Sequence, residues 1–280
     1  MEMIVIQKSQ LPAAMDRARS HYLIAGPVKD GHGHVIKHLD DNQLPDLEYS
    51  HTRLSPKSLV FSQSQILFRF GDPGGVTANA IEPDWDSRPV AVIGIRPYDA
   101  KALAMLRLNF DTKDVQDPYF IQNSERLTLI GLADTHADDA HFSTSCGTGP
   151  FDESCLDMIL VDHHTEFIGK ILTEKGQQFA DAAGIETVLS KDKSNAFEFA
   201  RKAAEDHISS HVEFSYLASA DTMALYDNAP WQDLAFACIN CGTCAFVCPT
   251  CWCFDIQDET VGQTRTRQRI WDTCMAGLYS

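Results

Sequence analysis

The sequence is poor in basic residues. It contains 23 Lys and Arg against 39 Asp and Glu, which gives a formal net charge of −16. A protein that neutralises nucleic-acid phosphates needs basic patches, and the one dense basic stretch here is TRTRQR, with Arg265, Arg267 and Arg269. The charge balance therefore argues against a nucleic-acid partner.

Long apolar runs and amino-terminal targeting signals are also missing. No stretch approaches the roughly 18–20 apolar residues that a membrane span requires. The start, MEMIVIQKSQ, lacks the basic region and the cleavage site of a signal peptide. We therefore expect a cytoplasmic protein, and in that reducing compartment clustered cysteines are more often metal or redox ligands than disulfides.

Motifs for nucleotide binding and for a catalytic nucleophile are absent as well. Neither G-x-G-x-x-G nor G-x4-G-K-[ST] occurs, and no acid/base pair stands out. The eleven His residues are scattered at spacings that do not converge on one ion. The sequence thus offers no support for an independent enzyme.

Six of the nine cysteines lie within seventeen positions, in CINCGTCAFVCPTCWCF. The spacing C-x2-C-x2-C-x3-C-P is that of ferredoxins, in which the short gaps allow three thiolates of one backbone turn to bind three corners of a cubane. Cys238, Cys241 and Cys244 meet this requirement, and Gly242 spares the backbone a side chain where it passes close to the cluster. Zinc sites prefer two C-x2-C pairs a dozen or more residues apart, so the spacing predicts a [4Fe–4S] cluster.

The fourth ligand of this cluster stays open. In ferredoxins with two such runs, the fourth cysteine of one run binds the other cluster, and this sequence has one run. The candidates are Cys248, Cys251, Cys253 and Cys274; for the last three, the alternative is a small buried residue or a free thiol. The arginines of TRTRQR are candidates for balancing the cluster's negative charge, the alternative being a solvated helix face.

Apolar patterning divides the chain into two parts. The first part has a buried-strand pattern over Val90–Ile95, a hairpin pattern over 157–172 and a helix that ends at Gly184. Beyond about residue 216 the strand signals stop and the pattern becomes helical. We predict an α+β protein: an N-terminal α/β docking domain over 1–225, followed by a small α-helical ferredoxin-like iron–sulfur module over 226–280.

The stretch CINCGTCAFVCPTCWCFDIQD, followed by RTRQRIWDTCM, resembles a family of iron–sulfur electron-transfer subunits. This family includes the beta subunit of cytoplasmic sulfhydrogenases and the iron–sulfur subunit of anaerobic sulfite reductase. GIRPYDAKAL, DPYF, SCGTGPF and LTEKGQQF extend the resemblance over most of the chain. It implies a non-catalytic component of an oxidoreductase complex that relays electrons through [4Fe–4S] clusters between a flavin-bearing donor and a catalytic subunit.

The sequence departs from the family pattern in two respects. The family has a second cysteine run beyond the CM segment, whereas this sequence stops at Ser280, which indicates either a fragment or a reduced module. Four cysteines typical of the family's first domain are replaced by Tyr98, Ala133, His141 and Ser143. We therefore expect no cluster in the first domain. The alternative to electron transfer is a structural or redox-sensing role, in which the cluster organises a complex without carrying current.

Overall fold

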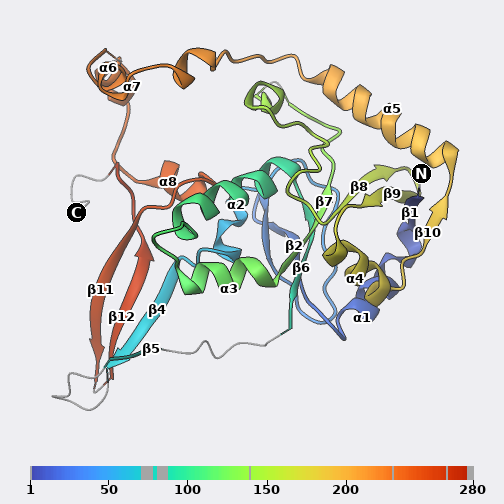
Figure 1. The fold of residues 1–280 in the computed structure, drawn as a ribbon, viewed down its shortest axis with the longest axis horizontal. Coiled ribbons are helices and arrows are strands. Elements are labelled where there is room, and N and C mark those ends of the chain that lie inside the picture. The colour runs from blue at the N-terminus through green and yellow to red at the C-terminus, as the bar shows by residue number, and fades with distance from the viewer. Residues whose placement is uncertain are drawn as a thin grey trace.

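Two β-sheets organise the protein in the computed structural model, which describes residues 2–70, 78–80, 88–138, 140–228, 230–262 and 264–275 (Figure 1). The eight-stranded sheet has the order β10 (Thr187–Leu189), β1 (Glu2–Gln7), β9 (Glu166–Ile171), β8 (Met158–His163), β7 (Leu127–Leu132), β6 (Val90–Ile95), β2 (Leu23–Asp30) and β3 (Gly33–His38). The four-stranded sheet has the order β11 (Phe254–Val261), β12 (Thr264–Trp271), β4 (Ser64–Phe70) and β5 (Ala78–Ala80).

The middle of the large sheet is parallel and buried. Strands β2, β6, β7 and β8 run parallel to one another, and the strands outside them pair antiparallel. Every residue of β6 is buried, as expected for a parallel strand covered on both faces. The predictions of a strand over Val90–Ile95 and of a hairpin, here β8 and β9, are confirmed.

Helices cover both faces of this sheet. Met15 of α1 and Phe179 of α4 pack on one face, whereas Leu106 of α2, Phe120 of α3 and Phe197 of α5 pack on the other. The helices are α1 (Leu11–Ala18), α2 (Pro97–Phe110), α3 (Pro118–Arg126), α4 (Glu174–Ala183), α5 (Lys191–His207), α6 (Thr222–Asn228), α7 (Trp231–Ala235) and α8 (Thr243–Val247), with 3-10 turns η1 (Lys8–Gln10), η2 (Pro56–Leu59), η3 (Ser143–Cys146) and η4 (Ser215–Ala218). Within the described ranges, no helix combines the length and apolar character needed to cross a membrane.

The prediction of a helical carboxy-terminal module is wrong for residues 254–271, which form the hairpin of β11 and β12. Strand β12 also pairs antiparallel with β4, so these two distant segments of the chain lie side by side (Figure 1). Strand β11 is largely exposed, β12 is partly buried, and both are rich in polar residues, so they lack the apolar alternation that marks a half-buried strand. Among the residues that the structure describes here, the helices are α6, which enters the module, α7 and α8.

An aromatic cluster joins this hairpin to the large sheet. Phe61 is 1% exposed, and its ring centroid lies 5.1 Å from that of Phe110 and 5.8 Å from that of Trp271. Phe254 of β11 and Phe120 of α3 complete the cluster. The division into domains 1–225 and 226–280 stays a prediction, and strand pairing and aromatic packing both cross that boundary.

Candidate metal centre

The first three cysteines lie where the chain passes from α7 into α8. Asn240, at φ 58°, and Gly242, at φ 70°, both adopt the left-handed backbone conformation, which turns the chain sharply. The N–H of Asn240 donates a hydrogen bond of 3.4 Å to Sγ of Cys238. Cys238, Cys241 and Cys244 are exposed, so the turn presents its three thiols at the surface.

Gly242 occupies a place where no side chain fits. A Cβ at this position would lie 2.7 Å from Cγ2 of Thr273, which is closer than real Cβ contacts. Thr273 is buried and immediately precedes Cys274. The close approach therefore holds the turn of the first cysteines against the segment that carries the last one.

Replacing Gly242 with Ala should reduce the iron content of the protein. A non-glycine residue in the left-handed conformation costs about 1–2 kcal/mol of conformational free energy. At this position the added Cβ would also meet Thr273, so the turn would have to move. Gly262→Ala is the matched control, because Gly262 has φ +63° but no atom within 4 Å of its Cβ site. We expect both variants to lose stability and only G242A to lose iron; equal iron content in the two would contradict this prediction.

The four candidates for the fourth ligand influence one another in two pairs. The pKa of Cys251 is raised partly by Cys248, and that of Cys274 is raised by Cys253. The charge of Cys244 also acts on Cys274, and that of Cys253 acts on Cys251. The contact of Thr273 with Gly242 places the segment that carries Cys274 beside the turn of the first run.

The neighbours of these thiols control their ionisation. The hydroxyl and N–H of Thr243 hold the pKa of Cys241 below its ordinary value, and the Cys241 Sγ and Thr243 Oγ1 atoms lie 3.2 Å apart. Burial raises the pKa of Cys251 to about 11, and the adjacent Cys248 adds to this effect. Burial opposes ionisation of Cys248 too, but hydrogen bonds from Thr250 and Cys251 outweigh it and lower the pKa. Cys241 and Cys248 thus ionise more readily than an ordinary cysteine. The thiolate is the form that binds metal.

The cysteines suit a multi-iron cluster better than a single ion. All nine are free thiols. Across the part of the chain that the structure describes, no three His, Cys, Asp or Glu side chains converge on one metal position. A [4Fe–4S] cluster takes four thiolates around its periphery, so its ligands do not share one ion. Exposed thiols on two adjoining segments fit that arrangement.

A buried lysine packs against this cysteine segment. Lys57, in η2, is 2% exposed, and its Nζ donates to the carbonyl oxygens of Ala245 at 2.7 Å, Cys248 at 3.0 Å and Cys251 at 2.9 Å. Its ammonium also lies 4.4 Å from the ring centroid of Trp271. Burial lowers the pKa of Lys57, and the charges of the adjacent thiols, Cys251 first, oppose that effect. Sequence reasoning missed this residue, because a single Lys in RLSPKSLV carries no local signal.

The three arginines of TRTRQR lie on β12, so the alternative of a helix face is wrong. Arg267 forms a two-pronged ion pair with Asp258 of β11, at 2.7 and 2.8 Å, and Arg265 lies over an aromatic ring of β4. Arg269 is 3% exposed and pairs with Asp117, the residue that caps α3. That these arginines balance the charge of the cluster stays a prediction. In the structure, Arg267 and Arg269 are paired with Asp258 and Asp117.

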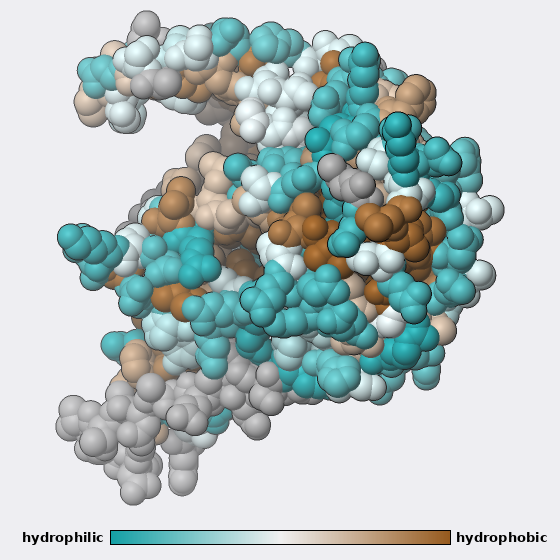
Figure 2. Space-filling view, turned by 45° about the vertical axis from the view of Figure 1, so that its right-hand side comes forward, coloured by the Kyte–Doolittle hydropathy of each residue, from teal (hydrophilic) through white to brown (hydrophobic). Residues whose placement is uncertain are grey.

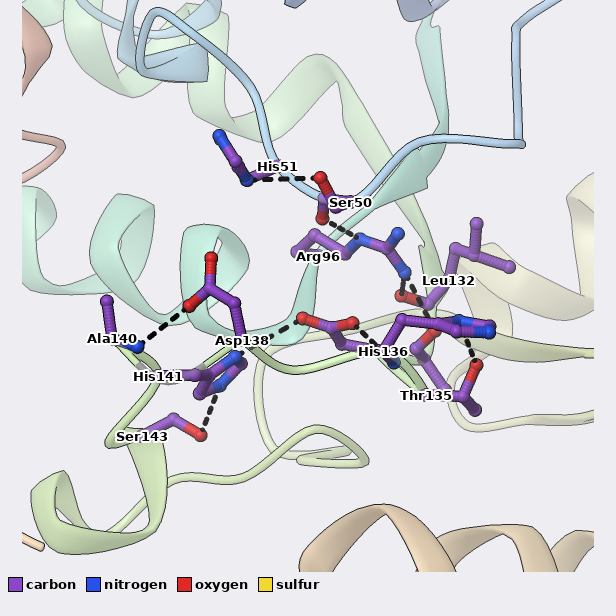
Figure 3. A network of polar contacts seen from close by, with 12 residues as sticks. Ser50, His51, Arg96, Leu132, Thr135, His136, Asp138, Ala140, His141 and Ser143 are labelled. Carbon is purple, nitrogen blue, oxygen red and sulfur yellow. Dashed lines mark hydrogen bonds and ion pairs between the residues drawn. The ribbon is translucent and has the colours of Figure 1, made fainter. Parts of the chain in front are cut away.

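The four positions that differ from the family come together beyond the carboxyl ends of β6 and β7. The rings of Tyr98 and His141 pack edge to face, 5.4 Å apart. Figure 3 shows His141 beside Ser143, with Nε2 of the histidine 2.8 Å from the serine Oγ. Arg96 donates to the carbonyl of Ala133 at 2.8 Å. These positions therefore surround a polar network, and the absence of a cluster there stays a prediction.

Comparison with known proteins connects the cysteine site to a family. A family model described as a 4Fe-4S dicluster domain matches residues 237–280. The chain is also similar to Sulfhydrogenase 2 subunit beta of Pyrococcus furiosus, with 23% identity over 279 residues, which cover 98% of this chain and 80% of that protein. No solved structure matches the chain significantly. The chain is therefore an iron–sulfur protein related to the sulfhydrogenase beta subunits, with at least one [4Fe–4S] cluster in its carboxy-terminal domain.

Proposed function

We propose that the chain is the electron-transfer subunit of a cytoplasmic oxidoreductase complex, such as a hydrogenase, a sulfite reductase or a related reductase. A [4Fe–4S] cluster supplies one-electron transfer when bound. The observation that carries the proposal is the exposure of Cys238, Cys241 and Cys244 within a 4Fe-4S dicluster domain. Ligands at the surface bring a cluster within reach of a redox centre on a neighbouring protein. The partners would be two further subunits, one a flavin-bearing donor and the other catalytic, with no nucleic acid.

We propose a ligand set for the first cluster. Cys238, Cys241 and Cys244 supply three ligands, as the spacing predicted. The proposed fourth ligand is Cys274 or Cys253, because Thr273, next to Cys274, packs against Gly242 of the first run. Cys248 and Cys251 then form a separate pair, which is available for a second cluster, in keeping with the dicluster match.

The segment between α5 and α8 suits a docking role. Figure 1 shows α6 and α7 standing away from both sheets, and Figure 2 shows an open notch between this arm and the body of the molecule. Its large apolar side chains are exposed: Tyr216, Leu217, Met223, Tyr226, Trp231, Leu234, Phe236 and Ile239. Single exposed apolar residues are ordinary, but eight of them within residues 216–239 favour an interaction surface on this segment. Because Phe236 is 92% and Ile239 84% exposed on either side of Cys238, a partner bound here lies next to the cluster.

Anaerobic redox titration of the purified complex tests this function. We expect the donor to bleach the visible band of the cluster and the acceptor to restore it, with one electron for each cluster. Phe236→Glu should slow reduction by the partner at unchanged iron content, because a carboxylate disrupts an apolar contact. Phe199→Glu is the control, since Phe199 is 77% exposed on α5. A cluster that the donor does not reduce would favour the structural or redox-sensing role instead.

A further inference from the structure

We propose that Lys57 is a positioning residue for the iron–sulfur site: its ammonium fixes the segment from Ala245 to Cys251 and supplies a buried positive charge that raises the reduction potential of the bound cluster. This inference concerns the cysteine site itself. It does not depend on the proposed electron-transfer partners, so it can fail or succeed separately from the proposed function.

The ammonium joins two segments that lead to cysteines. An ammonium has three N–H donors, and the three hydrogen bonds of Lys57 reach a carbonyl within α8, the carbonyl of Cys248 at the end of α8, and that of Cys251. A cation beside the last carbonyls of a helix is favourable, because that end carries partial negative charge. Trp271 covers the same ammonium, and the chain leads from Trp271 to Cys274. Lys57 is therefore a common anchor for the loop of Cys248 and Cys251 and for the strand that precedes Cys274.

The backbone around Lys57 is fixed by the protein core. The N–H of Lys57 donates to Oγ of Ser55 at 3.1 Å, and its carbonyl accepts from Val60 at 3.1 Å and Phe61 at 2.7 Å. Phe61 belongs to the aromatic cluster and is almost wholly buried. The backbone of Lys57 is thus held by residues far from the cysteines in sequence.

The partners of Lys57 indicate that an anion completes its surroundings. A buried ammonium without an opposite charge is unfavourable, and its three hydrogen bonds in the described chain all go to neutral carbonyls. Lys170 shows the contrast: it also lies 4.4 Å from an aromatic centroid, that of Phe197, but it pairs with the carboxylates of Glu153 and Glu198. The carbonyls of Cys248 and Cys251 accept hydrogen bonds from Lys57, so ligation of these neighbouring thiols as thiolates supplies the missing negative charge.

A charge at this place has a redox consequence. Reduction adds one electron to the cluster and makes it more negative, so a nearby positive charge stabilises the reduced state. Net charge and hydrogen bonding around a cluster are among the factors that set its reduction potential. The three hydrogen bonds of Lys57 hold its charge against the loop, so the charge cannot move away when the cluster is reduced.

Lys57→Met, Lys57→Arg and Lys170→Met, all in the full-length protein, test the proposal. In anaerobically loaded K57M we expect the equilibrium between reduced and oxidised cluster to shift at least about tenfold toward the oxidised form, which is 59 mV for a one-electron couple. K57R keeps the positive charge, so the reduction potential of its cluster should stay close to that of the unaltered protein. K170M removes a lysine that also lies 4.4 Å from an aromatic centroid but away from the cysteine run. The reduction potential of the cluster should therefore not change in this variant.

Hydrogen–deuterium exchange of the metal-free proteins tests positioning without a cluster. We expect the amides of residues 245–251 to exchange faster in K57M and at the usual rate in K170M. If K57M binds too little iron for potentiometry, iron binding restored in K57R supports the proposal, whereas equal iron loss in K57M and K170M overturns it. An unchanged potential in K57M overturns the charge role, and unchanged exchange overturns the positioning role.

Discussion

Replacing Cys241 with Ser removes most of the iron and sulfide from anaerobically prepared protein. Cys241 is the central cysteine of the run, its side chain is exposed, and contacts with Thr243 hold the pKa of its thiol below the ordinary value. A serine hydroxyl stays protonated and is a poor ligand for iron. Because metal binding contributes folding free energy in short segments, the turn from Cys238 to Cys244 should also become more sensitive to proteolysis.

The control for this substitution is Cys146→Ser. Cys146 is also an exposed free thiol, but it lies in η3, outside the cysteine run. We expect unchanged iron and sulfide in C146S, measured by colorimetric analysis and by the visible absorption band. Normal iron and sulfide in C241S would rule out the assignment of the first run as the cluster site.

Replacing Phe61 with Ala should lower the free energy of unfolding by about 3–5 kcal/mol, the usual range for a buried Phe. Phe61 contacts the rings of Phe110 and Trp271, so its removal leaves a cavity where the hairpin of β11 and β12 meets the rest of the protein. The carbonyl of Phe61 also accepts a hydrogen bond of 3.1 Å from Trp271 Nε1. We expect a single denaturant transition, shifted to lower concentration, because the hairpin and the large sheet share this cluster.

Phe199→Ala is the matched control, because Phe199 is largely exposed on α5. Exposed substitutions usually change stability by less than about 0.5 kcal/mol. Urea unfolding of the metal-free proteins, followed by tryptophan fluorescence and circular dichroism, measures both variants. A separate low-stability transition for the hairpin, with the remainder unaffected by F61A, would show that the carboxy-terminal segment folds independently.

Much of the large sheet could be predicted from the sequence, because its signals are local. The apolar run Val90–Ile95 is buried on both faces, which is the environment that such a run favours. Helix α4 begins where the Thr173 hydroxyl accepts the N–H of Gly176, and it ends at Gly184 in the left-handed conformation. The cysteine run could be assigned to a cluster for the same reason, since its ligand spacing lies within one turn of the chain.

The second sheet and Lys57 could not be predicted, because both depend on contacts between distant segments. Strand β12 carries Arg265 and Arg267 on an exposed hairpin, and its position is set by pairing with β4, which no local pattern encodes. Lys57 acquires its role only when η2 packs against the loop that contains Cys248. Because the strand character of TRTRQR depends on this pairing, the sequence alone left a helix face open as an alternative.

The most direct test of the central claim is the native mass and metal content of the protein purified without oxygen from its own source. We predict that the 31.1 kDa chain is recovered in a larger complex, with iron and sulfide bound and with a redox partner among the other subunits. A stable, cluster-loaded monomer that reduces a physiological acceptor unaided would contradict the assignment of this chain as an electron-transfer subunit.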